Sequence, residues 1–169
     1  SVAVQPSGTV TFVFTDIEGS TALLDDLGAE AYREALADHR RALREAFGAH
    51  SGYEVDDAGD GLFYAFGLAS GAVSAVAAAM ASLADGPVRI RVGVHTGEPL
   101  LDPPKYVGPD VHKAARIMSA AHGAQVLLSG ATRELVAEEV LDLGRHRLKD
   151  FSEQVSLYQL GSERFPPLR

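Results

Sequence analysis

The chain has 169 residues, 46% of them hydrophobic and 22% charged, which is the balance of one globular domain with a sizeable core. Its net charge of −8 argues against nonspecific binding to nucleic acid. The absence of cysteine excludes disulfide bonds and thiol catalysis, and no apolar run is long enough to predict a membrane span. We therefore expect a cytoplasmic domain that binds neither nucleic acid nor membrane directly.

The first predicted element is a β-strand over residues 9–15, where β-branched and aromatic residues alternate, after an N-terminal tail of residues 1–8. The strand leads into Asp16 and then into a turn of Gly, Ser and Thr. Ser20 or Thr21 is expected to cap a helix that continues to about residue 50, because apolar residues recur there at helical spacing. Gly28 is a candidate break in that helix.

Residues 53–66 predict a β-hairpin that turns at Gly59, Asp60 and Gly61. If this hairpin lies beside the first strand, the carboxylates of Asp16 and Asp60 emerge at one edge of one sheet. Paired carboxylates in that arrangement can hold two Mg²⁺ or Mn²⁺ ions against a nucleotide triphosphate. The plainer alternative is that Asp16 caps a helix and Asp60 is a turn residue.

The rest of the chain alternates between helical and strand patterns. Together with the first strand and the hairpin, these patterns predict an α+β fold with a ferredoxin-like βαββαβ core and a C-terminal α/β extension. Residues 161–169 are expected to be a tail or linker. The remaining expected elements are a helix over 69–83, a strand over 88–95, a proline-rich loop over 98–109, a helix over 110–121, a strand over 125–129, a helix over 131–140, and strands over 145–149 and 155–160.

Five blocks in order along the chain carry a family resemblance. They are TFVFTDIEGST, GYEVDDAGDGLFYAF, RIRVGVHTG, YVGPDVHKAARIMSAAHGAQVLLS and HRLKDFSEQVSLYQL. Over residues 9–160 the chain resembles the catalytic domain of class III adenylate and guanylate cyclases. The resemblance implies the same ferredoxin-like core, and it implies that ATP or GTP is converted to a 3′,5′-cyclic nucleotide and pyrophosphate in intracellular signalling.

The resemblance also implies roles for particular residues. Asp16 and Asp60 would bridge two divalent ions, with the carbonyl oxygen of Ile17 as a further ligand. Backbone N–H groups at the start of the following helix would cradle the triphosphate, aided by the helix dipole. The implied phosphate-binding set is Gly19, Ser20, Thr21 and Arg91, with Arg116 at the transition state and Lys149 at the terminal phosphates.

Three positions depart from the family pattern. His112 stands where the family usually has a catalytic asparagine, and its protonation depends on pH. Asp56 stands at the position of a base-selecting lysine, and Lys105 at the position of its acidic or threonine partner. This charge reversal suits the donors and the O6 acceptor of guanine better than the edge of adenine. The alternatives are a salt bridge between chains or base recognition that has decayed.

The family builds each site between two chains, so the resemblance implies a homodimer of weak association that is monomeric in isolation. It also implies regulatory domains in a longer protein. The charge distribution fits a head-to-tail pair, because residues 1–87 carry 4 Lys or Arg and 13 Asp or Glu, whereas residues 88–169 carry 11 and 10. A second hypothesis is a degenerate domain that binds nucleotide or a partner with little activity. A diguanylate cyclase or polymerase palm is disfavoured, because AGDGLF lacks that loop's paired acids.

Overall fold

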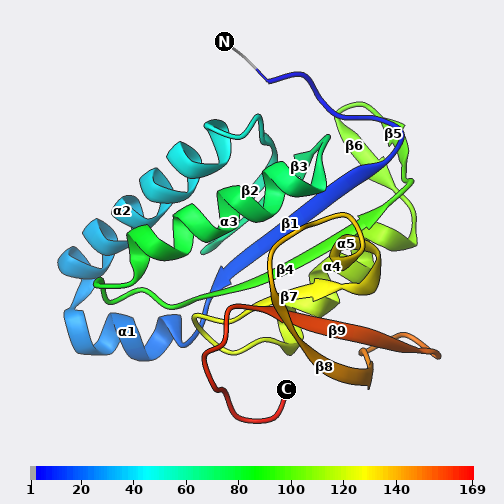
Figure 1. Ribbon diagram of the computed structural model, residues 1–169. Coiled ribbons are helices and arrows are strands. Elements are labelled where there is room, and N and C mark those ends of the chain that lie inside the picture. Colours follow the sequence, from blue (N-terminus) through cyan, green and yellow to red (C-terminus); the bar gives the residue numbers. More distant parts are fainter. Residues whose placement is uncertain (1–2) are drawn as a thin grey trace.

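The structure is a computed structural model that describes residues 3–169, so the first two residues of the expected N-terminal tail lie outside the described residues. A seven-stranded sheet forms the centre, in the order β2-β3-β1-β4-β7-β9-β8 (Figure 1). A separate hairpin of β5 and β6 lies beyond one end of β1. In chain order the elements are β1 Val10–Ile17, α1 Ser20–Leu27, α2 Ala29–Gly48, β2 Tyr53–Ala58, β3 Gly61–Phe66, α3 Ala69–Leu83, β4 Ile90–Gly97, β5 Leu100–Asp102, β6 Lys105–Val107, α4 Pro109–Ala120, β7 Val126–Ser129, α5 Gly130–Arg133, β8 Val140–Arg147 and β9 Gln154–Leu160.

The predicted ferredoxin-like core is confirmed by the order of the first four strands. β1 lies between β3 and β4 and is antiparallel to both, and β2 closes the edge beside β3. The extension then adds β7 parallel to β4, followed by the antiparallel pair β9 and β8. The chain therefore returns to the edge of β4 to enlarge an existing sheet, and it does not start a second one.

Helices cover the two faces of the sheet unequally. α2 and α3 lie on one face, where Phe47 and Val76 pack with Val13 and Tyr64 in the largest hydrophobic core (Figure 1). α4 lies on the opposite face, over β4 and β1. On that second face a smaller cluster of buried side chains joins the sheet to the β5–β6 hairpin and α4; its buried members are Val10, Phe12, Ala65, Tyr106 and Ala114.

The expected break in the first helical segment is confirmed at Gly28. This residue has φ of 84°, which a residue with a Cβ rarely adopts, and it separates α1 from α2. The expected cap by Ser20 or Thr21 is wrong. Ser20 is already the first residue of α1, and the preceding Gly19 supplies the cap position in the left-handed region with φ of 65° and without a side-chain hydrogen bond.

Three expected elements differ from the structure. Residues 98–109 contain the β5–β6 hairpin instead of a loop alone. The helix expected over 131–140 is the short α5, which ends at Arg133. The strand expected over 145–149 begins earlier, as β8 from Val140, with an irregularity in its pairing between Asp142 and Arg145.

The C-terminal residues fold back onto the domain. The backbone N–H of Arg169 donates to the carbonyl of Ala120 over 3.0 Å, and the Arg169 guanidinium pairs with Glu18 at 2.6 Å. The side chain of Leu168 packs against the cluster that contains Ile117. Across residues 3–169, no helix combines the length and the apolar character needed to cross a membrane.

Candidate active site

The structure brings Asp16 and Asp60 to one cavity. Asp16 is near the end of β1, and Asp60 lies in the tight turn between β2 and β3. Because Thr15 pairs with Leu62 in the β1–β3 register, the hairpin turn lies next to the end of β1. Both aspartates line a cavity of about 200 Å³, and Asp56 lines it as well. Three carboxylates thus share one small space on the sheet face that α2 and α3 leave uncovered.

An aromatic pair forms another part of this cavity. The rings of Phe14 and Phe63 stack with centroids 4.0 Å apart and planes 14° from parallel. Both rings are only partly buried, and Met118 of α4 lines the same space. The cavity therefore offers carboxylate oxygens beside a flat apolar surface, which suits a ligand with a charged part and a planar part.

The residues present fit divalent cations. Mg²⁺ is usually bound through one or two carboxylates together with substrate phosphates and water, and seldom by a cage of protein ligands alone. Within the described residues, no group of three or more His, Cys, Asp or Glu side chains converges to form such a cage. The carboxylates of Asp16 and Asp60, which share one cavity, match the former mode of binding. Ile17 has a buried side chain, so it can contribute only through its backbone carbonyl.

Arg91 contacts the candidate metal ligand directly. Arg91 and Asp16 are register partners on β4 and β1, and the Arg91 guanidinium grips the Asp16 carboxylate with two hydrogen bonds, one of them 2.7 Å long from Nε to Oδ1. A third hydrogen bond of 3.2 Å runs from Nη1 to the carbonyl of Ser119. The hydrogen bonds with Asp16 raise the pKa of Arg91. The family resemblance implies that Arg91 binds phosphates, whereas the structure pairs it with a carboxylate.

Two arginines of α2 hold the hairpin that carries Asp60, and neither is among the residues predicted for the site from the sequence. Arg40 donates to the carbonyl of Gly59 and lies 3.3 Å from Asp57. Arg44 pairs with Glu54 at 2.8 Å and with Asp57 at 2.9 Å. Hydrogen bonding by Arg44 lowers the pKa of Glu54. The spacing of four residues places both arginines on one helix face, which is the signal that could have indicated a shared partner.

The implied phosphate cradle follows Asp16 directly. Gly19 ends the turn after β1, and Ser20 and Thr21 begin α1, whose first N–H groups lack partners within the helix. Gly19 has open space around its Cα, and its positive φ disfavours other residues there. The backbone of Glu18 is tied to β4 by a 2.9 Å hydrogen bond from its N–H to the carbonyl of Arg89. This loop is therefore anchored next to the carboxylate cavity.

The three predicted catalytic side chains lie elsewhere on the chain. Arg116 of α4 donates to the carboxylate of Asp150 over 2.7 Å, and Lys149, the neighbour of Asp150, is exposed. His112 is exposed one helical turn before Arg116. Within the described part of the chain, none of the three lines the cavity of Asp16 and Asp60. The structure thus separates these three side chains from the carboxylate cavity of the same chain.

The two base-selecting candidates lie over the same face of the sheet. Lys105 begins β6, and the ring of the next residue, Tyr106, meets Phe12 edge-on at 5.1 Å. Phe12 in turn contacts Phe63 at 5.5 Å, and Phe63 is the register partner of Asp56. Over residues 3–169 no ion pair joins Asp56 to Lys105, and both side chains are exposed. They are therefore free to meet a ligand or another chain.

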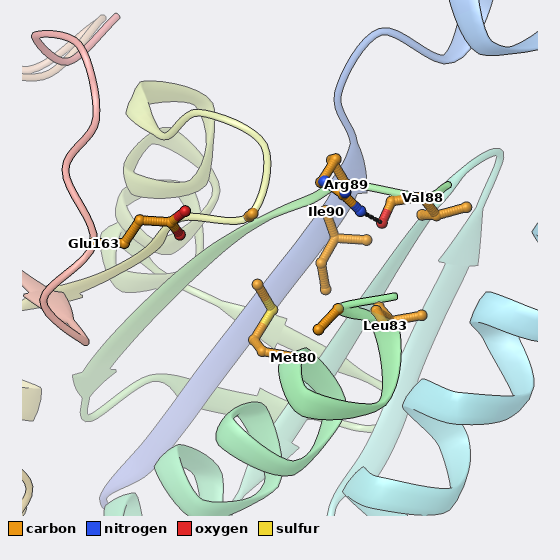
Figure 2. A pocket seen from close by; sticks show the side chains of 8 residues that line it. Met80, Leu83, Val88, Arg89, Ile90 and Glu163 are labelled. Carbon is orange, nitrogen blue, oxygen red and sulfur yellow. Dashed lines mark hydrogen bonds between the residues drawn. The ribbon is translucent and has the colours of Figure 1, made fainter. Parts of the chain in front are cut away.

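A separate cavity of about 280 Å³ lies where α3 ends and β4 begins (Figure 2). Its lining is mostly apolar, with Met80, Leu83 and Ile90 around it. The guanidinium of Arg89 is turned to the carbonyl of Gly86 at 2.7 Å, so it is already engaged. None of the predicted site residues lines this cavity.

Comparison with known proteins agrees with the fold. The family model described as the adenylate and guanylate cyclase catalytic domain matches residues 2–160. An uncharacterized protein of Mycobacterium tuberculosis is 38% identical over 98% of this chain, and the chain spans only 62% of that relative's length. An adenylate cyclase of Podospora anserina is 31% identical over 73% of this chain and 7% of its own length. A structure of adenylate cyclases from Trypanosoma brucei in their monomeric state has a TM-score of 0.89 and 26% identity, covering 98% of this chain and 94% of that one.

Proposed function

The chain belongs to the adenylate and guanylate cyclase catalytic domain family, and from this premise we propose that it is a nucleotide cyclase that acts as a homodimer in intracellular signalling. Its substrate is ATP or GTP, and its products are a 3′,5′-cyclic nucleotide and pyrophosphate. The single observation that carries the proposal is the cavity shared by Asp16, near the end of β1, and Asp60, in the turn that leads into the neighbouring strand β3.

In the proposed reaction the ribose 3′-oxygen forms a bond to the α-phosphorus, the bond from that phosphorus to the bridging oxygen breaks, and the hydroxyl proton passes to solvent. Two Mg²⁺ or Mn²⁺ ions bound by Asp16, Asp60 and the Ile17 carbonyl would activate the hydroxyl and neutralise phosphate charge. The N–H groups from Gly19 to Thr21 would hold the triphosphate. Arg91 would exchange Asp16 for a phosphate oxygen once the carboxylate has another partner.

The remaining roles require cations that the cavity of one chain lacks. Arg116 and Lys149 would stabilise the charge on the α-phosphate and on the leaving pyrophosphate, and His112 would orient the ribose through a ring N–H. These side chains lie outside the carboxylate cavity of their own chain. A second copy that presents its α4 to that cavity completes the site, which supports a homodimer with two shared sites.

The direct test is to incubate the purified chain with Mn²⁺ and either ATP or GTP and to identify the product by mass spectrometry. We expect a cyclic nucleotide that disappears when a chelator removes the metal. Turnover should rise more than linearly with protein concentration if the dimer is weak. No cyclic product from either nucleotide at high protein concentration would overturn the proposal.

A second candidate function is a degenerate domain that binds nucleotide or a partner without turnover. Two observations favour it: Asp56 and Lys105 reverse the charges expected for adenine, and His112 replaces the asparagine. Under this alternative the same incubation gives nucleotide binding without product.

We place either activity in the cytoplasm, and the longer mycobacterial relative leaves room for regulatory domains in a full-length protein.

The reversed pair predicts the preferred base. The carboxylate of Asp56 can accept from the N1–H and N2–H of guanine, and Lys105 can donate to O6, so GTP should compete well against ATP. The double variant Asp56→Lys with Lys105→Asp should shift the preference toward ATP, since each mispaired polar group costs ~1–3 kcal/mol. Competition between the two nucleotides measures this shift. An unchanged ATP/GTP ratio would mean that these residues do not read the base.

A further inference from the structure

A continuous network of polar side chains, most of them buried, joins five elements of the fold: β1, β4, β7, α4 and α5. Thr11 of β1 lies 2.9 Å from Thr96 of β4, and Thr96 lies 2.9 Å from Thr132 of α5, oxygen to oxygen. The Thr132 hydroxyl lies 3.3 Å from Ser129 Oγ at the end of β7. The network then continues from Ser129 through His95 to Asp110 of α4. Such a fully connected network specifies one arrangement of the elements that it joins, because a broken member leaves buried groups unpaired.

His95 is the link to α4. Its side chain is only 3% exposed, with Nδ1 at 2.7 Å from Ser129 Oγ and Nε2 at 2.6 Å from Asp110 Oδ1 in the first turn of α4. Burial lowers the pKa of His95, with the Lys113 charge acting in the same direction, while Asp110 opposes the shift. The ring is therefore neutral near pH 7. Ser129 donates to Nδ1, and the Nε2–H donates to the Asp110 carboxylate.

Two glycines flank His95 on the same face of β4. A Cβ on Gly93 would lie 2.3 Å from the backbone nitrogen of Met118 and 2.7 Å from the carbonyl of Ala114, so no side chain fits between β4 and α4 there. A Cβ on Gly97 would lie 2.1 Å from Asp110 Oδ2. Positions 93, 95 and 97 alternate onto one face of the strand. In the sequence GVHTG, Gly93 and Gly97 therefore allow α4 to pack closely on β4 at two points, and His95 lies between them.

The same helix carries the predicted catalytic side chains. Asp110 lies two residues before His112 and six before Arg116. Its hydrogen bond to His95 therefore fixes the position of α4 along β4, and the rotation of α4 about its axis, for the helix that carries His112 and Arg116. We propose that His95 is a positioning residue for catalysis: with Gly93 and Gly97 it fixes α4 on β4, so that Arg116 and His112 meet the substrate bound by the partner chain. This inference rests on the proposed cyclase function.

The test compares two replacements of His95. His95→Asn keeps a polar group near Ser129 but cannot reach Asp110, whereas His95→Gln extends an amide N–H to about the position of Nε2. We expect His95→Asn to lower kcat by on the order of 10–100-fold, with little change in KM, because a small displacement of catalytic groups has effects of that size. His95→Gln should recover much of the loss. Equal losses in both variants would overturn the inference.

Hydrogen–deuterium exchange separates this inference from the cyclase proposal. In His95→Asn we expect faster exchange in residues 109–120 and unchanged exchange in the β2–β3 hairpin. Unchanged exchange in 109–120 would overturn the positioning role, whatever the activity. If exchange in 109–120 is faster in His95→Asn, but the wild-type chain makes no cyclic nucleotide, only the cyclase proposal is overturned.

Mixing experiments give a readout that a merely destabilised chain cannot. His95→Asn damages only the half-site that contains Arg116, so its mixture with Asp60→Ala should regain activity, while its mixture with Arg116→Ala should not. A chain damaged throughout would fail in both mixtures, and that result would overturn the proposal. If His95→Asn does not fold, Asp110→Ala removes the same bond at a partly exposed position, with Asp110→Asn as the control that keeps the acceptor.

Discussion

Replacing Asp60 with alanine is expected to abolish cyclic-nucleotide formation while leaving the domain folded. Asp60 lies in a turn, and its hairpin is held by Arg40 and Arg44 through other groups, namely the Gly59 carbonyl and the side chains of Glu54 and Asp57. The fold therefore does not need the Asp60 carboxylate, whereas the binding of two metal ions in the cavity does need it. The loss should exceed the ~10–100-fold that follows removal of an outer partner of a metal ligand.

The measurements are turnover with Mn²⁺, Mn²⁺ binding by calorimetry, and the thermal unfolding midpoint. Asp60→Asn is the matched variant, since it keeps the shape of the side chain and removes its charge. Asp85→Asn is the control for charge alone, because Asp85 is exposed in the turn that follows α3. Turnover that persists undiminished in Asp60→Ala would exclude Asp60 as a metal ligand.

Two inactive chains are expected to restore activity when they are mixed. Asp16→Ala removes a ligand from the carboxylate cavity, and Arg116→Ala removes a cation from α4. In a mixed dimer, the cavity of the second chain faces the α4 of the first, and that one site retains all its groups. Half of random pairs are mixed and each has one intact site of two, so we expect up to about a quarter of the wild-type rate from the pairing model.

The control is a pair of chains damaged in the same half. Asp16→Ala mixed with Asp60→Ala should stay inactive, because both chains lack a working carboxylate cavity. Size-exclusion chromatography with light scattering would show whether dimers form under the assay conditions. Failure of Asp16→Ala and Arg116→Ala to complement, although mixed dimers are present, would show that the site is not shared between chains.

Local signals made parts of this fold predictable from the sequence. The hairpin at Gly59 and Asp60 has a turn sequence between two strand-forming runs, and the α3 pattern over residues 69–83 agrees with the structure at both ends. The structure of the proline-rich segment over residues 98–109 was harder to predict from the sequence. Pro103 and Pro104 suggested a loop, but they occupy the turn between β5 and β6, where no N–H is needed for the ladder.

The contacts of the site depend on residues far apart in the chain, and for these the sequence was a poorer guide. Asp16 and Arg91 are 75 residues apart, and only the antiparallel register of β1 and β4 makes them neighbours. The bond between His95 and Asp110 requires α4 to cross β4 at Gly93 and Gly97. A spacing pattern shows which residue types recur, but it does not show which distant side chain an arginine will pair with.

The pairing of Arg91 with Asp16 gives the free chain an internal counterion. The carboxylate at the end of β1 already has a counterion, because Arg91, whose side chain is 20% exposed, pairs with it. A cation that enters the cavity must release Arg91, and a triphosphate offers the released guanidinium a new partner. Metal and nucleotide should therefore strengthen each other's binding by the same factor, since thermodynamic linkage is reciprocal. The domain would then hold its ions weakly until a substrate arrives with them.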